Sequence, residues 1–264
     1  MQQLPLVSII TPCFNQEEFL SETILSVLQS TYPAIEMIIV DDGSTDESVK
    51  IGSSFAESHP QIVVHQQPNS GPSVARNRAI RLASGEYILP LDADDLISKD
   101  YVAKAVEVLE KDPKVKVVYC HARKFGNKEE DWKLADYSPP LLARKNMIFV
   151  SAMYRKVDWQ KCGGYAEEMT WGFEDWEFWI SMLKDGGKVV RLPITGFFYR
   201  IRKQSRRKSV TKRGRDLTVD FINKKHRDFI YEHLHGPLRK SKTWSKPINL
   251  FLKTLGLLPK QPDR

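Results

Sequence analysis

The chain has 264 residues, which is enough for one large domain with an extension. Its hydrophobic content of 41% and charged content of 28% are typical of a soluble globular protein, and no apolar stretch is long enough to span a bilayer. The first apolar run, Leu4–Ile10, is short and has no basic residues before it, so we expect no signal peptide. Three widely spaced cysteines without a CxxC pair indicate reduced thiols in a cytoplasmic protein.

The net charge of +7 is unevenly distributed. Residues 1–199 contain 21 Lys+Arg and 28 Asp+Glu, whereas residues 200–264 contain 19 and 5. A nucleic-acid enzyme would present a basic binding face, so an acidic body argues against a nucleic-acid partner. The basic C-terminal segment instead suggests contact with an anionic surface.

Strands and helices alternate in the first 98 residues. The periodicity predicts strands at 6–10, 37–40, 62–65 and 87–91, with helices at 17–30, 45–58 and 73–82 between them. This alternation predicts a doubly wound α/β fold, in which a mostly parallel sheet carries helices on both faces. Polar residues follow each strand, where ligands bind in such sheets, so we expect these loops to form one crevice.

The later chain is less regular. We expect a helix at 99–110, a strand at 116–120, an irregular aromatic segment at 125–165 and a helix at 174–183. Two further strands, at 189–192 and 197–201, would complete the sheet.

Three carboxylates directly follow the apolar run 87–91, namely Asp92, Asp94 and Asp95. Like charges this close repel one another, and a shared divalent cation removes that cost. Oxygen ligands suit Mg²⁺ or Mn²⁺, which also hold substrate phosphates. An isolated acidic cluster is more often a turn, so the surrounding motifs decide between the two interpretations.

Five motifs occur in order: TPCFN at 11–15, VDDGSTD at 40–46, NSGPSVARN at 69–77, LDADD at 91–95 and FEDW at 173–176. Over roughly residues 6–202 this set resembles the family 2 inverting glycosyltransferases of the GT-A fold. The resemblance implies a GT-A domain at 1–202, with a nucleotide-sugar half at about 1–98 and an acceptor half at about 99–202. A basic loop and helical extension would follow at 203–264.

The resemblance implies that the first half binds a UDP- or dTDP-sugar. Thr11 and Pro12 would lie along the base, and Asp41 or Asp42 would accept a hydrogen bond from its N3–H. A pyrimidine-dione offers one such donor between two acceptors. The donor-binding residues implied in this way are Thr11, Pro12, Asn15, Asp41, Asp42, Asn69, Gly71, Arg76, Asp92 and Arg202.

The resemblance also implies a Mn²⁺ or Mg²⁺ ion on Asp94 or Asp95, with Asp92 near the ribose or a metal-bound water. The cation would neutralise charge as the nucleoside diphosphate leaves. Many relatives carry a metal-binding histidine after the last strand, where this chain has Arg202. An arginine cannot ligate a cation, but it would hold a diphosphate through paired hydrogen bonds.

Inversion requires a carboxylate that takes the proton from the attacking hydroxyl. By its position in the last motif, Asp175 is the implied general base, with Glu174 in reserve. Carboxylates that only stabilise the start of a helix would give the same pattern. The acceptor-binding residues implied are Trp171, Gly172, Glu174 and Trp176.

The basic segment 202–215 is too charged to bury, and we expect a flexible loop. The family resemblance implies that this loop orders over the donor. A basic amphipathic helix is predicted at 217–234. Residues 246–260 mix leucines with lysines, as an interfacial membrane helix would, although a terminal helix packed on the body explains the pattern equally well.

The sequence therefore predicts a metal-dependent hexosyltransferase that acts on a glycan or lipid-linked saccharide in cell-surface polysaccharide synthesis, such as capsule or lipopolysaccharide. We expect it to be cytoplasmic and peripheral at the inner face of the membrane. The alternative is a catalytically silent glycan- or membrane-binding module on the same fold. A nucleotidyltransferase is a weaker alternative.

Overall fold

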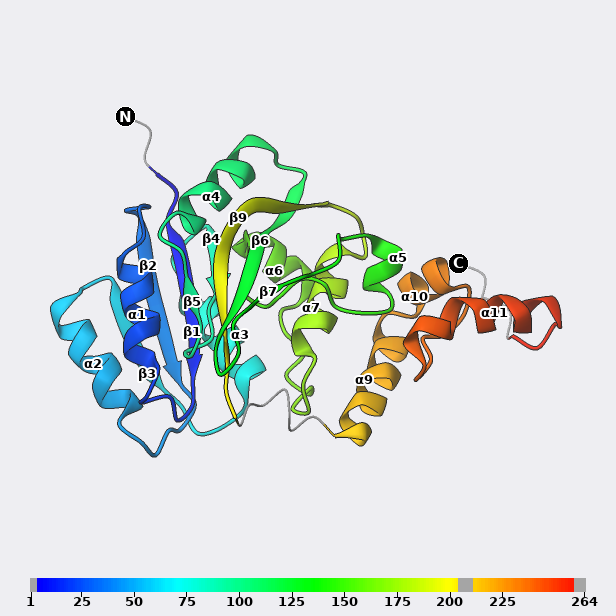
Figure 1. Cartoon of the computed structure of the whole chain (residues 1–264), viewed down its shortest axis with the longest axis horizontal. Coiled ribbons are helices and arrows are strands. Elements are labelled where there is room, and N and C mark those ends of the chain that lie inside the picture. The colour runs from blue at the N-terminus through cyan, green and yellow to red at the C-terminus, as the bar shows by residue number, and fades with distance from the viewer. Residues whose placement is uncertain (1–3, 204–210, 259–264) are drawn as a thin grey trace.

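The computed structural model describes residues 4–203 and 211–258, and within these ranges nine strands form one curled sheet (Figure 1). The strands are β1 (Val7–Cys13), β2 (Ile35–Asp41), β3 (Ile62–Gln66), β4 (Tyr87–Pro90), β5 (Leu96–Ile97), β6 (Val115–Gly126), β7 (Glu130–Trp132), β8 (Met153–Arg155) and β9 (Lys188–Ile201). Their spatial order is β3-β2-β1-β4-β8-β6-β9-β5, and β7 pairs with β6. The predicted α/β fold class is confirmed.

The helices of the domain are α1 (Leu20–Leu28), α2 (Ser48–Ser58), α3 (Pro72–Leu82), α4 (Tyr101–Lys111), α5 (Pro139–Leu142), α6 (Lys156–Cys162) and α7 (Glu174–Leu183). Strands β1 to β4 are parallel wherever they pair with one another. Two crossovers step outward to β2 and β3, and the third returns to β4. Because such crossovers are right-handed, α1 and α2 cover one face and α3 covers the other.

The predicted irregular segment 125–165 contains the strand that joins the two halves. Strand β8 has only three residues and pairs antiparallel with both β4 and β6. So short a run gives no periodicity to detect. The two strands expected at 189–192 and 197–201 are one strand, β9, which pairs in parallel with β6 across register shifts near Cys120 and His121.

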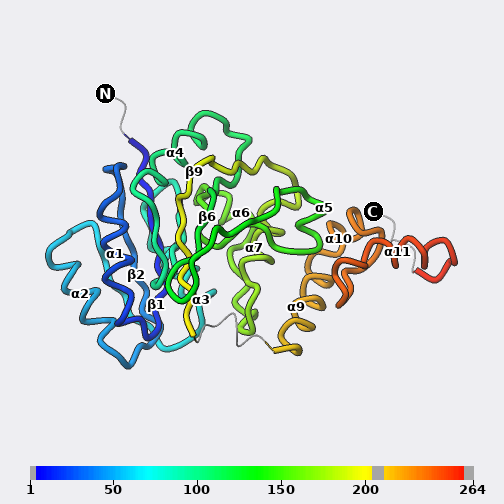
Figure 2. The backbone as a smooth tube through the Cα atoms, in the orientation of Figure 1, coloured from blue at the N-terminus to red at the C-terminus, as the bar shows by residue number. Residues whose placement is uncertain are grey.

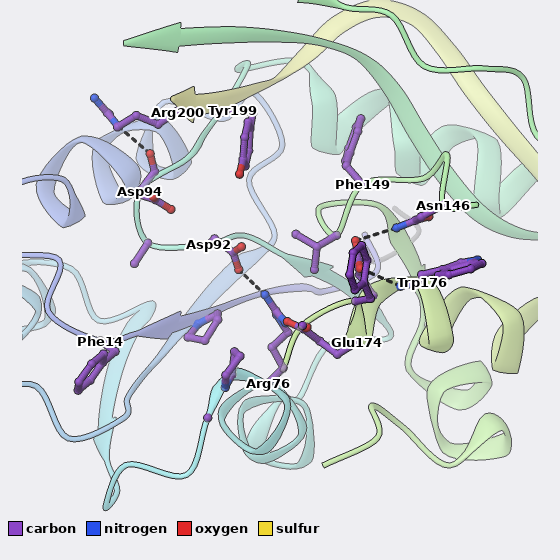
Figure 3. Close-up of a pocket in the computed structure, with 18 of the residues that line it drawn as sticks. Phe14, Arg76, Asp92, Asp94, Asn146, Phe149, Glu174, Trp176, Tyr199 and Arg200 are labelled. Atoms are coloured by element: carbon purple, nitrogen blue, oxygen red, sulfur yellow. Dashed lines mark hydrogen bonds and ion pairs between the residues drawn. The ribbon is translucent and has the colours of Figure 1, made fainter. Parts of the chain in front are cut away.

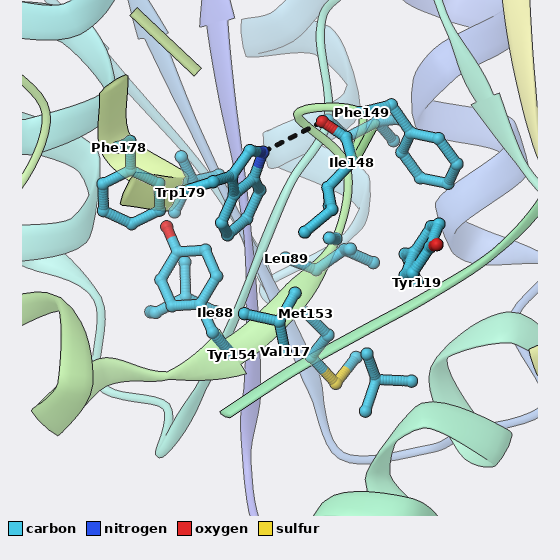
Figure 4. Close-up of a cluster of buried hydrophobic side chains, with 14 of the residues drawn as sticks. Ile88, Leu89, Val117, Tyr119, Ile148, Phe149, Met153, Tyr154, Phe178 and Trp179 are labelled. Carbon is cyan, nitrogen blue, oxygen red and sulfur yellow. Dashed lines mark hydrogen bonds between the residues drawn. The ribbon is translucent and has the colours of Figure 1, made fainter. Parts of the chain in front are cut away.

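Aromatic side chains of α7 fill the core behind β8 (Figure 4). The Tyr154 ring lies 5.2 Å from Phe178 and 5.9 Å from Trp179, measured between centroids. The Trp179 indole N–H donates to the carbonyl of Ile148 at 3.0 Å. A buried indole needs such a partner, so this hydrogen bond fixes Trp179 in the core.

The predicted helical extension is confirmed and comprises α9 (Lys212–Lys225), α10 (Arg227–Leu234), the 3₁₀ helix η1 (Lys242–Trp244) and α11 (Ser245–Thr254). The single helix expected at 217–234 is broken at His226. Figure 2 shows the extension following α7, on the side away from β2 and β3. Its buried apolar residues join the core of the domain, namely Val219, Ile222, Phe229, Ile230, Leu234 and Leu238.

The basic segment 202–215 is only partly covered by the structure. Residues 204–210 lie outside the described residues, and residues 212–215, which were expected in the loop, form the start of α9. No helix in the described ranges combines the length and the hydropathy needed to cross a membrane.

A buried polar cluster fastens the extension to α7. The Glu177 carboxylate, which is fully buried, accepts from His226 Nε2 at 2.6 Å, Lys225 Nζ at 2.9 Å and Ser181 Oγ at 2.7 Å. Burial opposes ionisation, but the hydrogen bond from His226 and the charge of Lys225 lower the pKa of Glu177. The carboxylate is therefore the acceptor around which α9 and α10 are docked.

We predict that Glu177→Gln lowers the free energy of unfolding by about 3 kcal/mol, because it leaves buried donors without their charged acceptor. Urea denaturation followed by circular dichroism would measure the change. Glu232→Gln, at an exposed position of α10, is the matched control and should change stability by less than about 0.5 kcal/mol. Equal effects of the two variants would show that the cluster does not hold the extension.

Candidate functional site

A cleft of about 1190 Å³ lies at the carboxyl ends of β1, β2 and β4 (Figure 3). Loops of the first half form one wall, and the segments 145–150 and 170–176 form the other. The end of β9 and the 3₁₀ helix η1 also contribute. The position agrees with the rule that open α/β sheets bind ligands at strand carboxyl ends.

Arg76 joins the two walls. Its guanidinium donates to Asp92 Oδ1 at 2.7 Å and to Glu174 Oε1 at 3.0 Å, and the residue is only 3% exposed. The centroid of the Tyr165 ring lies 5.5 Å from the Arg76 Cζ atom. A buried arginine stays charged and needs paired carboxylates, so this contact fixes Glu174 beside Asp92. In this arrangement both carboxylates hold Arg76 at the junction of the walls.

The acidic segment after β4 divides its carboxylates between two environments. Asp94 lines the cleft and pairs with Arg202 at 2.8 Å. Asp95 is 1% exposed and turns inward, where its Oδ1 accepts from the backbone N–H of Arg200 at 2.8 Å. Of the two residues expected to bind the metal, Asp94 therefore faces the cleft and Asp95 does not.

Burial raises the pKa of Asp94 to about 6, although Arg202 opposes the shift. Burial and the neighbouring Asp94 raise the pKa of Asp95 well above its ordinary value. Within the described residues, no group of three His, Cys, Asp or Glu side chains is arranged to hold a metal ion. Any cation at this wall would therefore need ligands from its substrate as well.

Four of the residues predicted to bind the donor line the cleft, namely Pro12, Asp42, Asn69 and Gly71. Asp42 also orders the 67–71 loop, because its carboxylate accepts from Gln67 Nε2 and from the N–H groups of Ser70 and Gly71, each at 2.8 Å. This carboxylate is therefore held at the cleft wall by backbone donors.

Three predicted donor residues do not line the cleft. Thr11 is fully buried within β1. The Asp41 carboxylate caps the turn that follows it, accepting from the N–H groups of Gly43 and Ser44. Asn15 is exposed and accepts from the N–H of Thr45 at 2.8 Å. Asp41 and Asn15 therefore hold the turn that follows β2, and Thr11 is part of the buried strand.

Aromatic side chains that the sequence analysis did not select line the cleft. Phe14 is 46% exposed at the donor wall, within the TPCFN motif that could have identified it. Trp132, Phe149 and Tyr199 come from the acceptor half, and no motif marks them. Arg200 also lines the cleft and donates to the carbonyl of Asp94 at 2.8 Å.

On the acceptor side, Asp175 lines the cleft next to Asn146. Gly172 and Phe173 adopt φ values of 106° and 66°, which turn the chain sharply into α7. The Asp175 carboxylate accepts from Asn146 Nδ2 and from the N–H of Trp176, both at 2.8 Å. Burial, with a contribution from Glu174, raises the pKa of Asp175 to about 7.

The two tryptophans expected at the acceptor site have other partners. Trp171 does not line the cleft; its indole donates to Thr218 Oγ1 at 3.1 Å, which fastens the loop to α9. Trp176 is 1% exposed and donates to the carbonyl of Leu142 at 2.7 Å. Trp176 still lines the cleft, but at 1% exposure it offers little free surface to a sugar.

The chain belongs to glycosyl transferase family 2, whose model matches residues 8–173. Over 106 residues it is 43% identical to a putative teichuronic acid biosynthesis glycosyltransferase, TuaG, of Bacillus subtilis, a match that covers 40% of this chain and 42% of that protein. The chain spans less than half the length of the relatives it matches.

Two solved structures share the fold. S. aureus TarS 1–349 in complex with UDP-GlcNAc superposes with a TM-score of 0.72 at 20% identity, over 91% of this chain and 73% of that one. A mannosyltransferase from Pyrobaculum calidifontis, in complex with GDP-Man and Mn²⁺, gives a TM-score of 0.64 at 20% identity, over 99% and 78%. The predicted GT-A fold is thereby confirmed.

We predict that Asn146→Leu raises the pKa of Asp175 above about 7, because Asn146 donates to the carboxylate and so favours its charged form. A pH titration of the Asp175 side-chain carboxyl carbon by NMR would measure the shift. Asn127→Leu, at an exposed position outside the cleft, is the control. A pKa that is unchanged or lower in Asn146→Leu would contradict this electrostatic account.

Proposed function

We propose that this protein is an inverting glycosyltransferase that transfers a sugar from a UDP- or dTDP-sugar to an acceptor hydroxyl. The observation that carries the proposal is one cleft with Asp175 on one wall and the acidic segment ending in Asp94 on the other. A carboxylate with a pKa of about 7 is suited to accept a proton near neutral pH. Membership of the family supports the same activity.

The donor would bind along the first wall. Pro12 and the exposed Phe14 offer apolar surface for a base, and Asp42, Asn69 and Gly71 offer polar groups beside it. UDP-GlcNAc in the similar TarS structure supports a uridine nucleotide. Arg200 and Arg202 would bring positive charge to the diphosphate.

A divalent ion, Mn²⁺ or Mg²⁺, would be held by Asp94 with help from Asp92. Both carboxylates line the cleft, and burial raises the pKa of Asp94 to about 6, so a bound cation would favour its ionised form. These residues therefore fit a cation whose other ligands are phosphate oxygens. When bound, the ion would supply Lewis-acid stabilisation of the leaving diphosphate.

Asp175 would act as the general base. Asn146 and the N–H of Trp176 orient its carboxylate, and Glu174 is engaged by Arg76 and therefore less free to accept a proton. Aromatic rings of Phe149 and Tyr199 line the space between this base and the acidic segment, where the sugar would lie.

The acceptor would be a glycan or lipid-linked saccharide of a cell-surface polysaccharide, as the names of relatives such as TuaG and a poly-β-1,6-N-acetyl-D-glucosamine synthase suggest.

The protein would lie peripherally at the inner face of the cell membrane. The support is a row of exposed apolar side chains in η1 and α11 and the loop that follows, among basic residues: Trp244, Leu250, Phe251, Leu255 and Leu257.

Replacing the base tests the chemistry. We predict that Asp175→Asn lowers kcat on the order of a hundredfold or more, whereas UDP binding, measured by calorimetry, stays within about twofold. In the unaltered enzyme the rate should rise with pH through about 7, because the carboxylate must be ionised to act. If Glu174→Gln were inactive and Asp175→Asn active, the role would pass to Glu174. Absence of UDP release from any donor would favour a silent binding module.

Manganese binding tests the acidic segment. We predict that Asp94→Asn weakens Mn²⁺ binding in the presence of UDP at least tenfold, as measured by electron paramagnetic resonance. Asp95→Asn should bind Mn²⁺ nearly as well as the unaltered protein, because this side chain is buried away from the cleft. A larger loss of Mn²⁺ affinity in Asp95→Asn would show that Asp95, and not Asp94, binds the ion. Full turnover in EDTA would contradict the proposal that the enzyme uses a metal ion.

Vesicle co-sedimentation tests the membrane contact. We predict that the protein sediments with anionic vesicles at low salt, because each basic residue at such a surface contributes about 1 kcal/mol. Exchanging Phe251 and Leu255 for Ser should weaken binding roughly tenfold or more. Leu82→Ser, at an exposed position of α3, is the control. Equal sedimentation with neutral vesicles, or no effect of the paired exchange, would contradict the proposal.

A further inference from the structure

The C-terminal extension contributes a lysine to the cleft. Lys242 is the first residue of η1 and lines the cleft together with Phe173 and Trp176. Its Nζ lies 4.3 Å from the centroid of the Trp176 ring and 5.0 Å from that of Phe173. Phe173 is the N-cap of α7, and Trp176 follows Asp175 in its first turn, so the ammonium lies at the end of the cleft that carries Asp175.

The Lys242 ammonium is held by aromatic faces. Among the residues that the structure describes, no carboxylate lies within ion-pair distance of its Nζ. A cation–π contact positions an ammonium without using its three N–H donors, which remain available to another partner. Burial and the charge of Arg215 lower the pKa of Lys242, and a bound anion would reverse that destabilisation.

The segment that carries Lys242 is built around buried polar groups. Asn249 is fully buried and donates through Nδ2 to the carbonyls of Leu234 and Pro237, at 3.1 and 2.9 Å. Its Oδ1 accepts from Arg239 Nε at 2.9 Å, and Ser245 Oγ accepts from the N–H of Arg239 at 3.0 Å. Such networks fix the backbone on both sides of η1, so the lysine is presented in a defined place.

The positive charge of Lys242 does not serve the diphosphate of the donor. The residues suited to a diphosphate, Arg200 and Arg202, lie at the end of β9 beside Asp94 on the opposite wall. Arg76 reaches the wall that carries Asp175, but its charge is paired with Glu174 and Asp92. The other cations on this wall, among the described residues that line the cleft, are Lys242 and the exposed Lys145. An anion on this wall would therefore belong to the molecule whose hydroxyl Asp175 activates.

We propose that Lys242 binds an anionic group of the acceptor, either a phosphate ester or the carboxylate of a sugar acid. The inference rests on the proposed glycosyltransferase function and specifies its acceptor class. The lysine is a binding residue, and its loss should raise the KM for an anionic acceptor while a neutral acceptor is little affected.

Steady-state kinetics with the full chain test this specificity. The probes are p-nitrophenyl β-D-glucoside, its 6-phosphate and p-nitrophenyl β-D-glucuronide, with a donor that the unaltered enzyme hydrolyses. Lys242→Met keeps the alkyl stem and should raise the KM for the preferred anionic probe tenfold or more, because a hydrogen bond to a charged group is lost. Lys242→Arg keeps the charge and should raise it by less than about threefold.

Lys104→Gln, at an exposed position of α4 outside the cleft, should leave all three KM values unchanged. A preference for the phosphate or for the glucuronide identifies which anion the site accepts. Equal KM increases for the neutral and anionic probes in Lys242→Met would overturn the inference, since Lys242 would then only clip the extension to the domain.

A binding measurement decides the question even if no donor is turned over. The lysines of the full chain are ¹³C-methylated, and the Lys242 signal is assigned from its absence in Lys242→Arg. Titration with either anionic probe should shift this signal, whereas the neutral glucoside should not. No shift with any probe, or the same shift with all three, would overturn the anion site. Failure to hydrolyse any donor would instead contradict the proposed function.

Discussion

The buried guanidinium of Arg76 is the interaction on which the rest of the site depends. It contacts Asp92, which follows the parallel strands of the first half, and Glu174, which opens α7 in the second. A guanidinium that is 3% exposed is stable only while both carboxylates remain in place. The acidic segment and the first turn of α7, which carries Asp175, are therefore held together across the cleft.

Two further arginines, Arg200 and Arg202, hold the carboxylates of Asp94 and Asp95 in place. Arg202 pairs with Asp94, and the backbone of Arg200 holds Asp95. Both arginines come from the end of β9, which lies beside the acidic segment because β5 pairs with that strand. Only one of the two adjacent carboxylates thereby lines the cleft, while repulsion from Asp94 still contributes to the raised pKa of the buried Asp95.

The C-terminal extension packs against the domain and contributes to the wall of the cleft. The Glu177 carboxylate accepts hydrogen bonds from Lys225, the last residue of α9, and from His226, which follows that helix. Trp171 donates to Thr218 of α9. The segment between α10 and α11 then brings Lys242 against Trp176. The loop between Trp171 and Trp176 is thus held from the extension on one side and by Arg76 on the other. A division of the chain at residue 202 separates groups that pack together.

Local sequence determined the strands of the first half, because parallel strands buried on both faces appear as apolar runs followed by polar residues. The roles of Asp42, Arg76 and Asp94 came from the resemblance of these motifs to a known family. Only the tertiary structure decided the rest. The pattern could not reveal β8, whose three residues are too few for a period, nor separate Asp94 from Asp95, which differ in burial and not in chemistry. It could not find Asn146 or Lys242 either, since contacts across 29 and 66 residues with Asp175 and Trp176 arise only from packing.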